Sequence, residues 1–208
     1  NTNADSSNNF LTINSDKLDD SYEAIYGYDA DGSGYTVYNN TSAALNLAPG
    51  QAFMIASDNT STDNISFTTD MRTMAGGDDL ILGRIMQDSY GLILSIYKGD
   101  TEIDQTKFYF KEGLTLGLDP GYDAGHFNQL AALTSRLVEE DEGVGFAINS
   151  MGLESIDDVV IPLEVNRESG NGFRISIHTN DIYEGTNIYL EDNVQGTLTL
   201  LNDQDFEL

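Results

Sequence analysis

The sequence predicts an all-β protein in which two antiparallel sheets pack face to face as a jelly-roll-like β-sandwich. Apolar residues alternate with polar ones in short runs along the chain, as in strands with one buried face. Glycine, asparagine and aspartate, which favour turns, separate these runs. A hydrophobic fraction of 39%, with 11 Tyr and 9 Phe, is enough to fill a large core.

The alternation assigns faces to the strands. Leu92, Leu94 and Ile96 share the inward face of one strand, and Phe108 and Phe110 share that of the next, with Tyr109 pointing outward. The predicted strands, in chain order, are 24–28, 35–38, 51–56, 65–68, 80–86, 91–98, 107–111, 144–148, 159–165, 173–177, and two around 188–190 and 198–200. Pro162 places the 159–165 strand at an edge or a bulge, because proline donates no ladder hydrogen bond.

One segment has helical character. Apolar residues in 123–138 fit a loose 3.6-residue period, which predicts one or two helical turns at most. The polar residues 1–9 are expected to form a flexible N-terminal arm. Because no internal repeat or linker divides the remainder, residues 10–208 are predicted to form a single β-sandwich domain.

The composition excludes several classes of function. Nine Lys and Arg against 35 Asp and Glu give a formal net charge of −26 and a pI of about 4.1, which excludes a nucleic-acid-binding protein. No apolar segment is long enough for insertion into a membrane. The absence of cysteine excludes disulfides, cysteine-ligated zinc and a thiol nucleophile. So acidic a surface is typical of proteins that work in salty water, which suggests an extracellular, marine setting.

Several short sequence motifs resemble those of a known family, and their order along the chain is more specific than any one of them. They are Tyr26-Gly27-Tyr28-Asp29, Leu47-Ala48-Pro49-Gly50, Phe67-Thr68-Thr69-Asp70, Gly117-Leu118-Asp119-Pro120-Gly121-Tyr122 and Tyr189-Leu190-Glu191-Asp192. This order resembles the β-rich region before the type IX secretion sorting domain in large secreted proteins of marine Bacteroidetes, although the tryptophan usual near Tyr28 is missing. The resemblance implies a secreted or cell-surface sandwich domain accompanied by other domains of the same parent chain. It implies no catalytic residue.

Two loops are candidates for a Ca²⁺ site. Asp29, Asp31 and Ser33 place oxygen side chains at alternate positions, as a calcium loop does, although Asn40 stands where a bidentate glutamate is expected. The alternative is a plain hairpin turn between two strands. Asp119 and Asp123 flank a Pro-Gly turn and are the second pair of candidate ligands. The alternative there is a turn in which Asp123 caps a short helix.

Four tyrosines are candidates for ligand binding. Tyr26, Tyr28, Tyr35 and Tyr38 lie on the two strands that flank the 29–34 loop, and several of them are expected to share one face. Exposed aromatic rings form stacking platforms for sugars. The alternative is that these rings form cross-strand pairs that stabilise the hairpin. Secondary candidates of the same kind are Tyr90, Tyr97 and Tyr109.

The sequence offers few candidate catalytic residues. His126 and His178 are the two histidines of the chain, and both read as ordinary surface residues. No nucleophile elbow, phosphate loop or zinc-protease motif is present. The sequence therefore predicts a non-catalytic accessory module, binding a polysaccharide or acting in adhesion. The alternatives are a structural spacer next to a secretion sorting signal and, third, a polysaccharide lyase or hydrolase.

Overall fold

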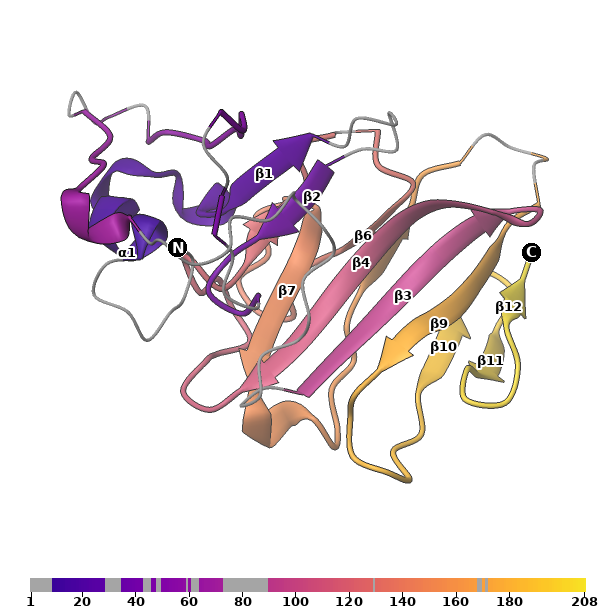
Figure 1. Ribbon diagram of the computed structural model, residues 1–208. Helices are drawn as coiled ribbons and strands as arrows, with labels where there is room; N and C mark the ends of the chain where they lie inside the picture. Colours follow the sequence, from indigo (N-terminus) through magenta and orange to yellow (C-terminus); the bar gives the residue numbers. More distant parts are fainter. Residues whose placement is uncertain are drawn as a thin grey trace.

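The computed structural model describes residues 9–28, 35–42, 46–47, 50–58, 60, 64–72, 90–128, 130–167, 170 and 172–208. In this part the fold is all-β with one short α-helix, as predicted (Figure 1). The helical segments are α1 (Phe10–Asn14), η1 (Ser15–Lys17), η2 (Asp20–Tyr22), η3 (Thr69–Met71) and η4 (Leu153–Ser155). The strands are β1 (Ile25–Tyr28), β2 (Tyr35–Tyr38), β3 (Tyr90–Lys98), β4 (Thr101–Lys111), β5 (Ala124–Gly125), β6 (Leu133–Ser135), β7 (Phe146–Gly152), β8 (Leu163–Val165), β9 (Arg174–Asn180), β10 (Tyr189–Asp192), β11 (Thr197–Leu200) and β12 (Phe206–Glu207).

An eight-stranded sheet forms the centre of the molecule. Its order is β12-β9-β3-β4-β7-β6-β8, and β5 pairs with β7 beside this path. The strands pair antiparallel except for β4 and β7, which run parallel from Lys107↔Ile148 to Lys111↔Gly152. The prediction of purely antiparallel sheets is therefore wrong at this pair. A parallel neighbour requires a long crossover, and the segment between β4 and β7 supplies it.

The predicted inward rows do form the main core. Leu92, Leu94, Ile96, Phe108 and Phe110 are buried in one cluster on a single face of the sheet. The two-stranded hairpin of β10 and β11 lies on this side. Its Leu190, and Ile188 just before β10, are partly buried and pack against this cluster. We call this side of the sheet the inner face and the opposite side the outer face.

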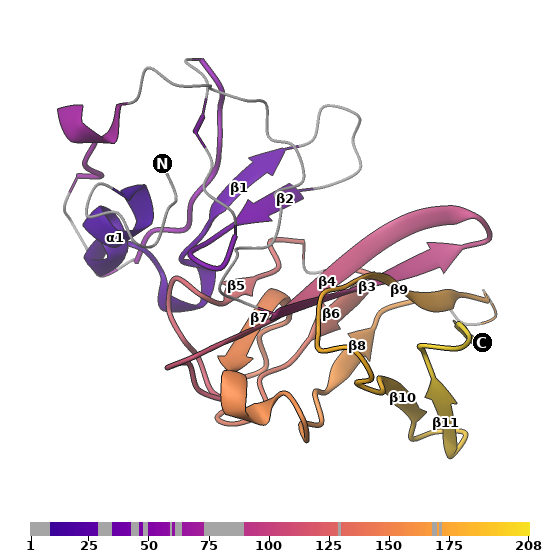
Figure 2. The same cartoon turned by 60° about the horizontal axis from the view of Figure 1, so that its bottom comes forward.

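The outer face is covered at one end, which the alternation alone did not show. Tyr109 was predicted to point outward to solvent, but only 4% of it is exposed. It packs in a second cluster with Ala24, Tyr26 and Ile148. The N-terminal unit, the described part of residues 9–72 with α1, β1 and β2, provides this cover. Figure 2 shows this unit on the opposite side of the sheet from the β10–β11 hairpin.

Buried polar groups dock the N-terminal unit onto the sheet. The Asn39 side chain donates a hydrogen bond to the carbonyl oxygen of Tyr122, and the backbone N of Asn40 donates to the carbonyl oxygen of Gly121 at 2.8 Å. Ser150 Oγ on β7 donates to the same Tyr122 oxygen at 2.7 Å. Gly121 makes this approach possible, because a Cβ there would lie 2.8 Å from Asn40 Nδ2 and its φ is +77°.

Several predicted elements differ from the structure. The described residues of 123–138 contain no helix; β5 and β6 form there and pair with β7 and β8, so sheet pairing outweighs the weak helical period. Residues 51–56 and 65–68 form no strand. The predicted strand 80–86 and the first eight residues of the expected arm lie outside the described residues. None of the helices in the described part is long and apolar enough to span a membrane.

Candidate functional sites

Two of the four predicted tyrosines are buried, so their assignment to an exposed platform is wrong. Tyr26 has no exposed surface and Tyr38 is 1% exposed. The Tyr26 ring stacks on Phe127 at a centroid distance of 3.7 Å, and its hydroxyl donates to Gly125 O at 2.8 Å. Burial of this ring raises the pKa of Tyr26. These contacts make Tyr26 a core residue between the N-terminal unit and the sheet.

The other two tyrosines form an accessible pair. Tyr28 is 62% exposed and lies directly opposite the half-buried Tyr35 in the register of β1 and β2. The rings meet edge to face at 5.5 Å, and Phe127 supports Tyr35 from 6.0 Å. Because Tyr35 is held on two sides, the pair presents a preordered aromatic surface. Of the secondary candidates, Tyr90 and Tyr97 are half-buried and Tyr109 is core.

The Asp119 and Asp123 carboxylates organise their own loop. Asp119 Oδ2 accepts hydrogen bonds from Thr115 N at 2.7 Å and from Thr115 Oγ1 at 3.1 Å. Asp123 is fully buried, and its two oxygens accept from Asp119 N at 2.7 Å and Ser150 N at 2.6 Å. Burial raises the pKa of Asp123 to about 7, although both hydrogen bonds act to lower it. Turn bracing thus accounts for both carboxylates without a metal.

The other predicted calcium ligands, Asp29, Asp31 and Ser33, lie outside the described residues, so their prediction stands as it was made. Within the part that the structure describes, no three His, Asp or Glu side chains gather closely enough to hold a metal ion. An open cavity of about 460 Å³ between η2 and the 137–146 segment is nevertheless strongly acidic. Its carboxylates are Asp19, Asp20, Asp58, Glu140 and Glu142.

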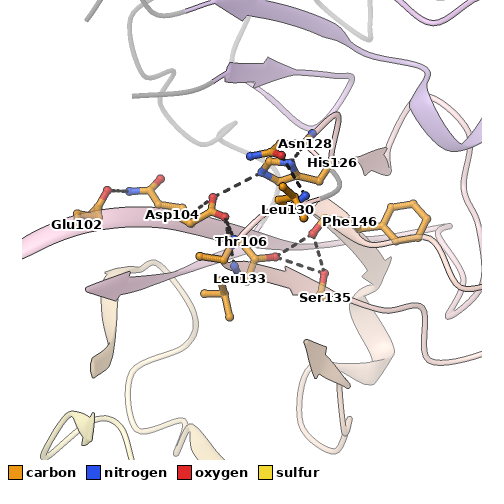
Figure 3. A network of polar contacts seen from close by, with 11 residues as sticks. Glu102, Asp104, Thr106, His126, Asn128, Leu130, Leu133, Ser135 and Phe146 are labelled. Carbon is orange, nitrogen blue, oxygen red and sulfur yellow. Dashed lines mark hydrogen bonds and ion pairs between the residues drawn. The ribbon is translucent and has the colours of Figure 1, made fainter. Parts of the chain in front are cut away.

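His126 lies in a clamp that fixes the loop before β6 to strand β4 (Figure 3). Its Nδ1 accepts a hydrogen bond from Asn128 N at 3.1 Å, so Nε2 carries the proton and lies 3.5 Å from Asp104 Oδ1. The other Asp104 oxygen accepts from Ala132 N at 2.7 Å and Leu133 N at 3.2 Å. With both ring nitrogens engaged, His126 helps to hold the loop against β4.

His178 belongs to a polar cluster that was not predicted. Glu102 on β4 is the centre of this cluster. Its Oε2 lies 3.3 Å from His178 Nδ1 and accepts from the Tyr97 hydroxyl at 3.0 Å, while its Oε1 accepts from Gln105 Nε2 at 2.7 Å. The Arg174 guanidinium lies over the Tyr97 ring at 4.0 Å. Side chains from three adjacent strands, β9, β3 and β4, thus meet on one surface.

Two β-bulges assemble this cluster. Ile96 pairs with Asp104 but Tyr97 pairs with Glu102, so Ile103 is an extra residue in β4. Residues three apart, such as Glu102 and Gln105, point to opposite faces of a regular strand, and the bulge brings them to the same one. In β9 the extra residue is His178 itself, between the partners of Ile93 and Leu94. A single sequence carries no signal for such bulges, so the pattern predicts only an ordinary surface residue at His178.

Comparison with known protein families gives a match over almost the whole chain. A family model described as a domain of unknown function (DUF8693) covers residues 5–208. The chain belongs to this family. No curated protein and no solved structure matches the chain. The DUF8693 match spans both the N-terminal unit and the eight-stranded sheet, and therefore includes the tyrosine pair and the Glu102 cluster.

Proposed function

We propose that this protein is a non-catalytic carbohydrate-binding module, and that Tyr28 and Tyr35 form its stacking platform. The observation that carries the proposal is the 62% exposure of Tyr28 beside a second ring fixed at 5.5 Å. An aromatic ring offers apolar area to the face of a sugar and loses little side-chain entropy on binding. Isolated exposed tyrosines are common on protein surfaces, but in this pair the Tyr35 ring is also supported by Phe127.

The support beneath the pair is a continuous stack of rings. Phe127 contacts Tyr35 and lies flat against the buried Tyr26, whose hydroxyl is fixed to Gly125 O. The platform therefore rests on the core that joins the N-terminal unit to the sheet. A rigid platform favours binding, because the protein has less freedom to lose when the ligand arrives.

We further propose that the protein works outside the cell, secreted or at the cell surface, next to other domains of its parent chain. The resemblance to the region before a type IX secretion sorting domain supports this setting. So does the net charge of −26 with no cysteine, which suits a salty medium. The engaged ring nitrogens of His126 and the bracing role of Asp123 favour binding over catalysis.

Affinity electrophoresis tests the proposal. The intact protein is run through native gels that contain laminarin, xylan, galactomannan or alginate. We expect at least one polymer to retard the wild type, and Tyr28→Ala to abolish most of the retardation. Tyr189→Ala is the matched control, because Tyr189 is 53% exposed on β10 and has no role in the platform. The proposal fails if no gel retards the protein, or if both variants behave alike.

A further inference from the structure

The outer face of the sheet carries a second set of groups suited to a ligand, away from the tyrosine pair. We define the Glu102 face as the side chains of Ser95, Tyr97, Glu102, Gln105, Arg174, Ser176 and His178. The N-terminal unit covers the other end of this face, above Tyr109, and leaves the Glu102 face accessible. His178 is 40% exposed at its side chain and Glu102 34%.

Ser95 lies at the base of this face and has an unsatisfied hydroxyl group. The residue has no exposed surface, and its Oγ finds no hydrogen-bond partner among the described residues. Its register partners are Gln105 on β4 and Ser176 on β9, so its side chain projects on the same face as theirs. Most buried polar groups in proteins have a partner, so an exception calls for an explanation. A bound ligand that rearranges the groups above Ser95 provides one.

Gln105 is the group through which a ligand reaches Ser95. At present the Gln105 amide donates to Glu102 Oε1 at 2.7 Å, at an exposed position. A ligand hydroxyl that donates to Glu102 Oε1 would replace the Gln105 amide as the donor to this oxygen. The Gln105 amide is then available to turn toward Ser95, which lies one strand spacing away. Ligand binding would thereby give a partner to the Ser95 hydroxyl, which has none among the described residues.

The charges of this face favour an uncharged ligand. Arg174 donates to Asp205 at 2.7 Å, and His178 lies against Glu102. Lys107, half-buried, follows Gln105 on the same side of β4. Glu207, the register partner of Arg174 across β12 and β9, adds a third carboxylate on this side. Three carboxylates thus stand against two cations, so the face has no excess of positive charge. An anionic polymer would gain no unpaired cation here and would be repelled by the net charge of −26.

The remaining groups match the surface of a sugar. The Tyr97 ring, held under the Arg174 guanidinium, supplies an aromatic edge. Glutamate, glutamine and histidine side chains accept and donate hydrogen bonds to vicinal hydroxyls. We propose that the Glu102 face is a second binding site, and that its ligand is a neutral, hydroxyl-rich saccharide.

The two histidines allow the site to be observed directly. NMR spectra of the intact protein should contain one Cε1–H signal from His178 and one from His126, assigned with His178→Gln. Neutral hexasaccharides of glucose, mannose or xylose and an acidic hexauronate serve as probes. We expect a neutral probe to shift the His178 signal and to leave in place that of His126, whose ring nitrogens contact Asp104 and Asn128 rather than a side chain of the Glu102 face. The shift should persist in Tyr28→Ala and weaken at least several-fold in Gln105→Ala and Ser95→Ala.

The outcomes separate this site from the tyrosine platform. The second site is overturned if no neutral probe moves the His178 signal, if only the hexauronate does, or if Tyr28→Ala removes the shift. Gel retardation that depends on Tyr28 would in those cases still support the platform. Conversely, a shift at His178 without any Tyr28-dependent retardation would support the second site and refute the proposed platform. Thermal unfolding of each variant shows that a lost shift is not lost folding.

Discussion

Replacing Ser95 with alanine removes a fully buried hydroxyl that has no hydrogen-bond partner among the described residues, and the free protein should become more stable. A buried polar group left unsatisfied costs about 1–3 kcal/mol of desolvation, whereas deleting one oxygen opens only a small void. We therefore expect Ser95→Ala to raise the free energy of unfolding by about 1 kcal/mol. For a domain of this length that corresponds to about 2–4 °C in Tm.

Ser176→Ala is the matched control, because Ser176 pairs with Ser95 across the strands and its Oγ accepts a hydrogen bond from Arg174 at 3.3 Å. Losing that bond should lower stability by about 0.5–1.5 kcal/mol, so the two variants should shift in opposite directions. Circular dichroism at increasing temperature and urea titration measure both. The reasoning is refuted if Ser95→Ala is destabilised as much as Ser176→Ala, since the Ser95 hydroxyl would then have a partner in solution.

Three further predictions concern the buried groups. Burial raises the pKa of Glu23 from 4.5 to about 7, so its contribution to stability is greatest below pH 4.5 and is lost as the pH rises through 7. In urea unfolding, the free energy of unfolding of Glu23→Gln should therefore equal that of the wild type near pH 4 and exceed it by roughly 2 kcal/mol at about pH 8. Equal pH profiles of the two proteins would contradict this. Tyr26→Ala should lower the free energy of unfolding by about 3–5 kcal/mol, whereas Tyr28→Ala should lower it by less than about 1 kcal/mol; similar losses in thermal melts would show that Tyr28 is core. Asp104→Ala leaves the partly buried amides of Ala132 and Leu133 without their acceptor, so it should lower the free energy of unfolding by about 1–2 kcal/mol and speed their hydrogen exchange; unchanged exchange would show that Asp104 does not hold the loop.

The apolar alternation was sufficient to predict the class of fold and the inner core. Leu92, Leu94 and Ile96 are buried together because a period of two fixes which side chains share a face. The same rule predicted wrongly that Tyr109 is exposed to solvent. Alternation distinguishes the two faces of a sheet, but it does not say what covers the second face. The cover comes from Ala24 and Tyr26 of the N-terminal unit, more than eighty residues earlier in the chain, and no local pattern predicts that contact.

The candidate sites were predicted only in part, for a related reason. Tyr28 and Tyr35 lie opposite each other at the turn end of the hairpin, and this pairing follows from the hairpin register alone. Tyr26 was misassigned, because Phe127, its stacking partner, comes from a distant loop. The Glu102 face was missed because it depends on one extra residue in each of two strands. A bulge inverts the assignment of faces beyond it, and composition shows no trace of it.

The docking of the N-terminal unit has a consequence for the order in which the chain folds. Asn39 finds its partners at Tyr122 and Thr41, and Thr41 meets Ser150, 109 positions later. The first third of the protein therefore cannot complete its buried hydrogen bonds until most of the chain has been synthesised. Contacts so distant in sequence slow folding, because a long loop must close before they form. During that interval the aromatic underside of β1 and β2 stays uncovered, so early folding is when this protein is most vulnerable to aggregation.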